Sequence, residues 1–285
     1  MICRAINLSQ STYFSSVNRG LSNRAKQDQI IKKEILEIYT FADKRFGAYK
    51  INNKLEQRNI NISIGKTYRL LSTMNLPTIF TKKPNLKTAK PDNNLDCPNL
   101  INGNFNTSAP NVVWVSDITY TKVNGHKAFI CIILDLFARK IIAYKCSSNM
   151  KKELVMETFA NALKNRNYPK NVIFHSDRGS QYTSKAFRQM IDIANFHQSF
   201  SKPGYPYDNA VAECFFKYFK QGEINRRCYR TMQDLELSTF VYIEKFYNSY
   251  NPHSYNNDLT PNQKEELFFQ NPLPFKSQNF YQQLT

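Results

Sequence analysis

Three strand-like segments in close succession constrain the fold of this chain most strongly. They span residues 112–120, 127–135 and 140–147, and each is rich in β-branched and aromatic side chains. Asn124 and Gly125 separate the first two segments, and an Asn-Gly pair favours the tight turn of a β-hairpin because both residues tolerate a positive φ. The sequence therefore predicts an antiparallel meander of three strands.

Helices and strands alternate after this meander. Helical patterns near 151–165 and 183–194 are interleaved with short β-favouring runs at 172–177 and 197–201, and a further helix begins near residue 208. This order predicts an α/β fold, with a mixed five-stranded sheet flanked by helices. A ribonuclease H-like core has the same order of elements.

Residues 23–80 predict a small all-α domain before the sheet. Isoleucine and leucine recur at helical spacing over 30–38, and two shorter helical segments cover 48–55 and 67–71. A polar turn lies between the two short helices, and Ser63 is the predicted N-cap of the second. The pattern is that of a helix-turn-helix.

The last helix of that domain carries Lys66 and Arg69, as expected of a helix that reads DNA. A plain three-helix bundle with a solvated basic face explains the same spacing equally well. Residues 1–22 look like the end of another helix-turn-helix unit, truncated by the start of the chain. The segment 81–110 is rich in proline and asparagine, so it is the predicted linker. The core is then expected over 111–265, with a C-terminal tail at 266–285.

The chain is strongly basic. Lys and Arg number 39 against 22 Asp and Glu, a formal net charge of +17. Fixed cations displace counterions from phosphates, so nucleic acid is the predicted partner; a basic surface that only keeps the protein soluble is the alternative. The longest apolar run, 128–134, is far shorter than the roughly 20 residues of a membrane-spanning helix. The six cysteines form no CxxC pair. We expect a cytoplasmic protein without a membrane segment or structural zinc.

Three acidic residues are candidates for a metal centre. Asp117 lies in the first predicted strand, Asp177 at the end of the fourth, and Glu213 on the late helix. Carboxylates brought together in this way can hold two divalent metals about 4 Å apart, which stabilise the attacking and leaving oxygens of a phosphodiester. The prediction is metal-dependent chemistry on nucleic acid.

The helix around Glu213 is predicted to be amphipathic. At 100° per residue, Asn209, Lys217 and Lys220 fall on the side of Glu213, while the aromatic residues fall on the opposite side. One face would then present a metal ligand beside cations that grip DNA phosphates. An ordinary amphipathic surface helix is the alternative.

The polar segment around Asp177 follows a predicted strand directly. Arg178 is therefore a candidate for lining a phosphate-binding mouth, although an ordinary surface loop fits as well. His175 can touch substrate or be a satisfied buried histidine. Asp135 is the main competing acid, and we expect it in a turn or in an ion pair with Arg139 rather than on a metal.

Several blocks of the chain resemble DDE-class insertion-sequence transposases, specifically the OrfB-type catalytic protein of bacterial two-frame elements, whose core is similar to that of retroviral integrases. The blocks, in family order, are PNVVWVSDITY, LDLFARKIIAY, HSDRGSQYTS, SKPGYPYDNAVAECFFKYFKQGE and FYNSYNPHSYNNDLTP. FGAYKINNKL and TYRLL resemble the N-terminal helix-turn-helix of the family. The resemblance extends over about residues 5–265.

The resemblance implies that Asp117, Asp177 and Glu213 form a catalytic triad that holds two Mg²⁺ or Mn²⁺ ions, and that Lys220 contacts the terminal DNA of the element. It implies hydrolytic cleavage that exposes a 3′-hydroxyl, followed by attack of that hydroxyl on another phosphodiester. The implied partners are double-stranded DNA, at the terminal inverted repeats and the target, and further copies of the chain. The implied location is the bacterial nucleoid.

Two features depart from the family pattern. Asn251 stands where the family usually has an arginine, and the stretch SYNNDLTP replaces a more apolar version that contains glycine; both affect the expected C-terminal contacts more than the triad. The start at Met1 cuts into a helix-turn-helix, and the resemblance implies that the active enzyme forms by frameshift fusion to an upstream-frame protein. Two other functions remain open: a non-catalytic DNA-binding regulator of transposition, and a structure-specific nuclease on the same core.

Overall fold

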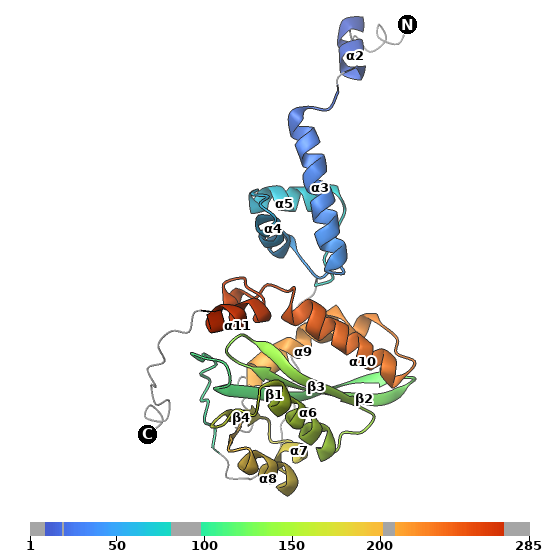
Figure 1. Cartoon of the computed structure of the whole chain (residues 1–285). Helices are drawn as coiled ribbons and strands as arrows, with labels where there is room; N and C mark the ends of the chain where they lie inside the picture. Colours follow the sequence, from blue (N-terminus) through green and yellow to red (C-terminus); the bar gives the residue numbers. More distant parts are fainter. Residues whose placement is uncertain (1–8, 19, 81–97, 202–208, 271–285) are drawn as a thin grey trace. The chain divides into compact units, whose positions relative to one another are not determined.

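The computed structural model describes residues 9–18, 20–80, 98–201 and 209–270 (Figure 1). The chain divides into two compact units, Met1–Ile79 and Phe80–Thr285. Most of the predicted linker, most of the predicted tail and the first part of the truncated N-terminal segment lie outside the described residues.

The N-terminal unit is helical, as predicted. Ile31, Ile35 and Ile38 are buried on one side of its longest helix, while Ile30 and Leu36 are exposed, so only one stripe of the apolar run enters the core. Within its described residues, the helices of the unit are α2 (Gln10–Val17), α3 (Asn23–Phe41), α4 (Ala48–Gln57) and α5 (Ile64–Thr73).

Two polar contacts fix the last two helices of this unit. Ser63 is the N-cap of α5, because its hydroxyl accepts a hydrogen bond from the backbone N–H of Lys66 at 3.2 Å, which confirms the predicted cap. The buried hydroxyl of Thr67 donates to Asn52 Oδ1 at 2.7 Å and ties α5 to α4. The turn between α4 and α5 therefore has a defined geometry.

The second unit contains the predicted five-stranded mixed sheet. Its order is β3-β2-β1-β4-β5, with β2 antiparallel to both β1 and β3, and β4 parallel to both β1 and β5. Asn124 and Gly125 have φ values of 46° and 80°, which confirms the predicted hairpin. The strands are β1 (Val113–Val123), β2 (His126–Asp135), β3 (Lys140–Ser147), β4 (Ile173–Ser176) and β5 (His197–Phe200).

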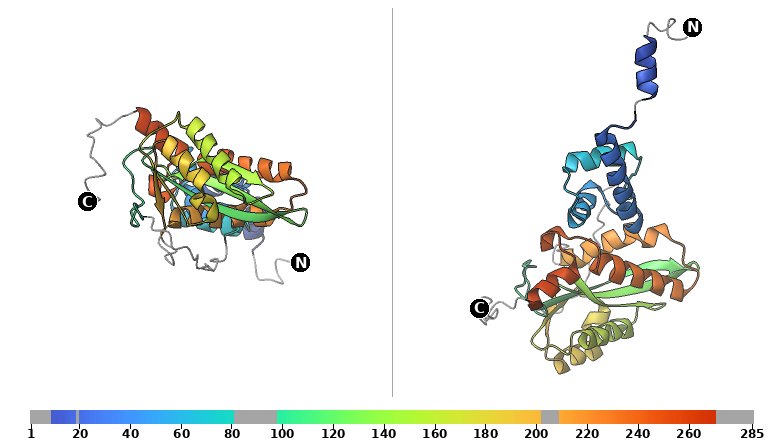
Figure 2. Two further views of the ribbon diagram at one scale, coloured as in Figure 1. Left: turned by 90° about the horizontal axis from the view of Figure 1, so that it is seen from below. Right: turned by 45° about the horizontal axis from the view of Figure 1, so that its top comes forward.

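Helices cover both faces of the sheet. In Figures 1 and 2, α6, α7 and α8 lie on one face, and α10 and α11 lie on the other. This is the ribonuclease H-like arrangement that the order of elements predicts. The helices of the unit are α6 (Lys152–Asn165), α7 (Ser180–Thr183), α8 (Lys185–Ile193), α9 (Ala210–Gly222), η2 (Ile224–Arg226), α10 (Met232–Phe240), the π-helix η3 (Val241–Asn248), η4 (Ser254–Asn256) and α11 (Pro261–Gln270).

The helix predicted near 183–194 is α8. Ser184 separates it from α7, because its backbone is extended and its hydroxyl accepts a hydrogen bond from the N–H of Phe187, which starts α8. The short helix α7 before it was not predicted. Among the described residues, no helix has the length and hydrophobicity needed to cross a membrane.

Aromatic side chains fill the core between the sheet and α6–α8. The ring of Phe159 on α6 packs edge-on against Trp114, Phe174, Phe187 and Phe196, with ring centroids 5.2–6.4 Å apart. Edge-to-face pairs of this kind contribute about 0.5–1.5 kcal/mol each beyond the burial of their area. β1 and β4 are therefore packed against a dense aromatic core.

Asp135 is a structural residue at the end of β2. Its two carboxylate oxygens accept hydrogen bonds from the N–H groups of Asn111, at 2.8 Å, and Phe137, at 3.0 Å. The predicted turn is thus confirmed, but the predicted ion pair with Arg139 is wrong: the nearest guanidinium is that of Arg166, 3.6 Å away. Arg139 instead stacks over the ring of Tyr255, 3.8 Å from its centroid.

Arg166 links this carboxylate to the last described helix. It forms an ion pair with Glu265 on α11, which also accepts a hydrogen bond from Lys140 at 2.8 Å. Burial raises the pKa of Asp135 to about 6, while the Arg166 charge opposes that rise. These four side chains form a largely buried charge network, and we refer to Asp135, Lys140, Arg166 and Glu265 below as the charge network.

Candidate active site

The sheet brings two of the predicted acids to the same level. The parallel pairing of β1 with β4 places Val115 opposite His175, and Asp117 and Asp177 each follow two residues later. The carboxyl ends of neighbouring parallel strands meet at one edge, where open α/β sheets bind ligands. Asp117 and Asp177 therefore come from adjacent positions in the sheet.

A hydrogen bond brings the start of α9 to the same place. Asn209, at the N-cap of α9, donates from Nδ2 to the backbone carbonyl of Ser116 at 3.2 Å. Glu213 lies in the first turn of this helix and is partly exposed. The third predicted acid thus lies on an element that is fastened to β1 beside Asp117.

The electrostatics of Asp117 indicate that the three acids share one region. Burial is the largest effect and raises the pKa of Asp117 to about 8. The Asp177 and Glu213 carboxylates raise this pKa further, whereas a hydrogen bond from the N–H of Ile118 and the ammonium of Lys220 lower it. The sequence-predicted acids and Lys220 are therefore within electrostatic range of one another.

Backbone N–H groups orient two of the carboxylates. Asp117 Oδ1 accepts from Ile118 N at 2.8 Å, and Asp177 Oδ1 accepts from Gly179 N at 3.0 Å. A β-carbon at Gly179 would stand 3.0 Å from Asp177 Oδ1, so the absence of a side chain permits this approach. Burial raises the pKa of Asp177, and the Gly179 hydrogen bond opposes that rise.

The chemistry of this donor set fits a hard divalent cation. Three carboxylates supply oxygen ligands, and a cation between them would relieve their mutual repulsion. In the described part of the chain, however, no three His, Cys, Asp or Glu side chains are arranged closely enough to hold a metal ion as they stand. The structure therefore brings the three acids into one neighbourhood without giving them a coordinating arrangement.

Lys217 and Lys220 are the two lysines of α9, the helix that carries Glu213. Lys220 Nζ lies 5.1 Å from the ring centroid of Tyr120 on β1, and Lys217 Nζ lies 5.8 Å from that of Tyr218. Both lysines are partly exposed, so their ammonium groups remain accessible to a polyanion. They share the helix of Glu213, as predicted.

Two other predicted DNA contacts are engaged within the protein. Asn209, expected on the exposed face of the helix, is instead buried at the start of α9, where it bonds to Ser116. Arg178 donates from Nε to the carbonyl of Ser201 at 3.1 Å. Both side chains hold backbone segments near the acids.

The two DNA-binding candidates in the N-terminal unit differ in their surroundings. Lys66 forms an ion pair with Asp28 on α3 at 2.7 Å. Arg69 is exposed on α5. Arg69 is therefore the more accessible of the two to a phosphate.

His175 is a satisfied buried histidine. Its ring nitrogens lie 2.8 Å from Ser199 Oγ and 3.2 Å from Ser201 Oγ. This confirms the structural alternative for the residue.

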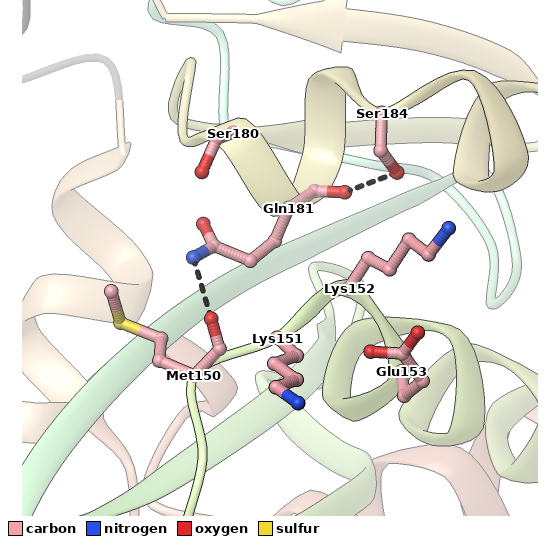
Figure 3. Close-up of a pocket in the computed structure, with 7 residues that line it drawn as sticks. All are labelled: Met150, Lys151, Lys152, Glu153, Ser180, Gln181 and Ser184. Carbon is pink, nitrogen blue, oxygen red and sulfur yellow. Dashed lines mark hydrogen bonds between the residues drawn. The ribbon is translucent and has the colours of Figure 1, made fainter.

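Sequence reasoning missed a hollow beside the Asp177 loop. It has a volume of about 340 Å³ and lies between the start of α6 and the α7–α8 segment (Figure 3). Gln181 closes one side by donating to the carbonyl of Met150 at 3.0 Å. The signal in the sequence is the Lys151–Lys152 pair just ahead of a helical pattern. The lining residues are Met150, Lys151, Lys152, Glu153, Ser180, Gln181 and Ser184.

Comparison with protein-family models gives two matches, both described as an integrase core domain. The first covers residues 107–206 and the second covers residues 195–261. All three predicted acids lie within these ranges. The matched region corresponds to the sheet and the helices around it.

Several known proteins are similar to this chain. The transposase of insertion sequence element IS904 from Lactococcus lactis is 30% identical over 84% of this chain and 94% of that protein. The 31 kDa protein of insertion element IS600 from Shigella sonnei is 28% identical over 94% of this chain and 99% of that protein. A protein named ATP-dependent protease, from Lactococcus lactis, is 50% identical over 47% of this chain, but this chain spans only 40% of its length.

Among solved structures, the catalytic core of HTLV-2 integrase in complex with magnesium is 17% identical to this chain. The similarity covers 55% of this chain and 98% of that one, with a TM-score of 0.44. The catalytic domain of Mos1 mariner transposase is 13% identical over 47% of this chain and 70% of that one, with a TM-score of 0.40.

Proposed function

This chain belongs to the insertion-sequence transposases that carry an integrase core domain, and we propose that Asp117, Asp177 and Glu213 are its catalytic residues. As a transposase it is a polynucleotidyl transferase, which cleaves DNA at the ends of a mobile element and transfers the freed strand to new DNA. The observation that carries the residue assignment is the geometry of β1, since its pairing with β4 sets Asp117 beside Asp177 and the hydrogen bond from Asn209 to Ser116 attaches the helix of Glu213 to the same place.

A divalent metal would be held by the three carboxylates. When bound, a pair of Mg²⁺ or Mn²⁺ ions supplies Lewis-acid chemistry that activates the attacking oxygen and stabilises the leaving oxygen. The protein orients Asp117 and Asp177 by the N–H groups of Ile118 and Gly179, each of which engages one carboxylate oxygen. Among the described residues, no hydrogen bond is seen to the second oxygen of either carboxylate, which leaves it available as a ligand.

The reaction has two phosphoryl-transfer steps, a hydrolysis and then a transesterification. In the first, water attacks a phosphodiester at the element end, and the bond that breaks releases a 3′-hydroxyl. In the second, that hydroxyl attacks a phosphodiester of the target, so that one bond forms as another breaks and no external energy source is needed. Neither step requires a covalent enzyme intermediate or a histidine base.

Cationic side chains around the site would bind the DNA. Lys217, Lys220 and the lysines of the hollow, Lys151 and Lys152, supply charge on the core unit. In the N-terminal unit we assign phosphate contact to Arg69, whereas Lys66 supports α5 through Asp28.

We further infer that the protein acts on double-stranded DNA as a homo-oligomer at the bacterial nucleoid, since transposition requires two element ends to be held together. The frameshift fusion to an upstream-frame protein belongs to the same proposal. It predicts that the chain alone binds element ends more weakly than the fusion, because the fusion adds DNA-binding segments.

The proposed function is tested with the purified full chain, Mg²⁺ or Mn²⁺, and a labelled duplex that contains a terminal inverted repeat. Nicking at the end, followed by covalent joining of that strand to a plasmid, is the expected result. Tight, salt-sensitive binding without metal-dependent cleavage would favour the regulator instead. Cleavage without any joined product would favour the nuclease.

Lys220→Ala is expected to weaken binding to element ends about tenfold, because it removes one charge-assisted phosphate contact worth about 1.4 kcal/mol. The slope of log K against log salt should become shallower by about 1. Fluorescence anisotropy over a range of salt concentrations measures both quantities. Lys164→Ala removes the same charge from an exposed position on α6 and should change neither. Equal effects of the two variants would contradict a specific contact at Lys220.

A further inference from the structure

We propose that Ser116 is a positioning residue that holds together the three acid-bearing segments of the active site. Its hydroxyl is bonded to Tyr182, in the short helix that follows Asp177. Its backbone carbonyl is bonded to Asn209, at the start of the helix that carries Glu213. The inference rests on the proposed function, because it concerns the geometry of the same acids.

The first contact, between the hydroxyls of Ser116 and Tyr182, is buried, and the Ser116 hydroxyl forms a second hydrogen bond as well. Ser116 and Tyr182 are 0% and 1% exposed, and their oxygens lie 2.8 Å apart. The Ser116 hydroxyl also lies 2.8 Å from the carbonyl of Ile132 on β2, which can only accept a hydrogen bond. The Ser116 hydroxyl therefore donates its single hydrogen to the carbonyl of Ile132. In the bond between the two hydroxyls, Tyr182 is then the donor and Ser116 the acceptor. This chain of donors fixes α7 against the middle of the sheet.

The second contact, between the Ser116 carbonyl and Asn209, lies beyond the part of β1 that pairs with β4. The pairing of β4 with β1 is seen only as far as Val115, one residue before Ser116. Asn209 is buried and forms no side-chain cap bond with its own helix, so its amide serves the contact with Ser116 rather than the helix end. The start of α9 is thereby attached to β1 at the residue next to Asp117.

The three carboxylates need contacts that hold their segments together, because their charges repel one another. Three carboxylates brought together in a region of low dielectric repel one another, and they come from segments far apart in the sequence. A displacement of about 1 Å can cost a hundredfold in rate. Partners that orient metal ligands are each worth about 10–100-fold in metal affinity or activity. Ser116 touches both of the other acid-bearing segments from the position beside the first acid.

Tyr182→Phe is the test, because it removes one oxygen and keeps the ring between Phe174 and Phe187. We expect kcat for nicking to fall about 10–100-fold while KM for DNA stays within about twofold. Affinity for Mn²⁺ alone, measured by electron paramagnetic resonance without DNA, should fall about tenfold. Loss of affinity for the metal without loss of DNA binding separates positioning from general damage to the fold.

A matched control is Tyr229→Phe. Tyr229 is also a buried tyrosine whose hydroxyl bonds to a serine, Ser238 at 3.1 Å, but it lies on neither of the segments that follow Asp177 or precede Glu213. It should retain wild-type kcat and Mn²⁺ affinity. Thermal unfolding of both variants should be similar, so that a difference in kcat cannot come from stability.

Two further variants test the two contacts. Ser116→Ala removes the same hydrogen bond as Tyr182→Phe, so the double variant should lose no more activity than the more damaging single variant. Asn209→Asp is nearly isosteric but sets a carboxylate oxygen against the Ser116 carbonyl, so it should reduce kcat and Mn²⁺ affinity as Tyr182→Phe does.

The proposal is overturned if Tyr182→Phe behaves like Tyr229→Phe, or if the double variant loses the product of the two single losses. Failure of the proposed function can be told apart from failure of the Ser116 proposal, because the wild type would then neither nick nor join DNA. In that case the Mn²⁺ affinities still decide the role of Ser116. A wild-type protein that binds no Mn²⁺ and does not nick DNA would overturn both proposals.

Discussion

Asp177→Asn abolishes nicking and strand joining together, with an expected loss of at least about a thousandfold in each rate. The substitution is isosteric, and the amide oxygen can still accept the hydrogen bond from Gly179, so the local backbone should persist. What disappears is one of the three carboxylates that we propose to hold the metal. Single-turnover assays with a labelled inverted-repeat duplex, and with a pre-nicked duplex for the joining step, measure the two losses separately.

Stability should move in the opposite direction from activity. Asn removes a carboxylate whose charged form is disfavoured by burial, so the free energy of unfolding of the metal-free protein is expected to stay the same or increase. Urea denaturation in the presence of a chelator measures it. Asp192→Asn, at an exposed position on α8, is the matched control and should leave both rates unchanged. Retention of a tenth of the wild-type rate by Asp177→Asn would remove this residue from the catalytic centre.

Arg166→Met should cost the catalytic unit about 3–5 kcal/mol of unfolding free energy, because it leaves two buried carboxylates without their shared cation. Asp135 is 0% exposed and the Glu265 side chain 5% exposed, so water cannot replace the guanidinium. Lys140 still faces Glu265, but no other cation is seen near Asp135 among the described residues. Denaturation followed by the intrinsic fluorescence of Trp114, in the core of this unit, reports the loss.

The loss should depend on pH in a defined direction. Burial raises the pKa of Asp135 in the folded protein to about 6, above its usual value, so its stabilising contribution is present at low pH and disappears as the pH rises through 6. Arg166→Met should therefore be more damaging at pH 7.5 than at pH 5. Lys145→Ala breaks an exposed ion pair with Glu157 and should cost less than about 1 kcal/mol at either pH. A loss from Arg166→Met as small as that of the control would show that the charge network does not stabilise the unit.

Local sequence signals account for most of the fold. The Asn124–Gly125 pair specifies its hairpin through two positive φ angles, and the apolar runs on either side of it pair as β1 and β2. Contacts between residues far apart in the sequence could not be predicted in this way. The choice of Arg166 over Arg139 for Asp135 depends on where α6 ends relative to β2, and nothing near Asp135 in the sequence encodes that distance.

The acids of the candidate site were evident from their sequence blocks, but the side chains that hold them in place were not. The angle of 100° per residue predicts Asn209 on the exposed face only if residue 209 is part of the helix. Its φ of −123° and ψ of 29° lie outside the regular helix, so that angle does not apply. Ser116 and Tyr182 are ordinary residues in a strand and a short helix, and their bond exists only after the sheet has assembled.

The charge network also shows that the catalytic unit extends beyond the region that matches the integrase core. The integrase-core match stops at residue 261, which is the first residue of α11, whereas Glu265 lies on the following turn. A fragment cut at the limit of the match would leave Lys140 without its carboxylate and Arg166 with Asp135 alone. Anyone who isolates this domain for crystallisation or inhibitor screening should keep the whole of α11, through Gln270.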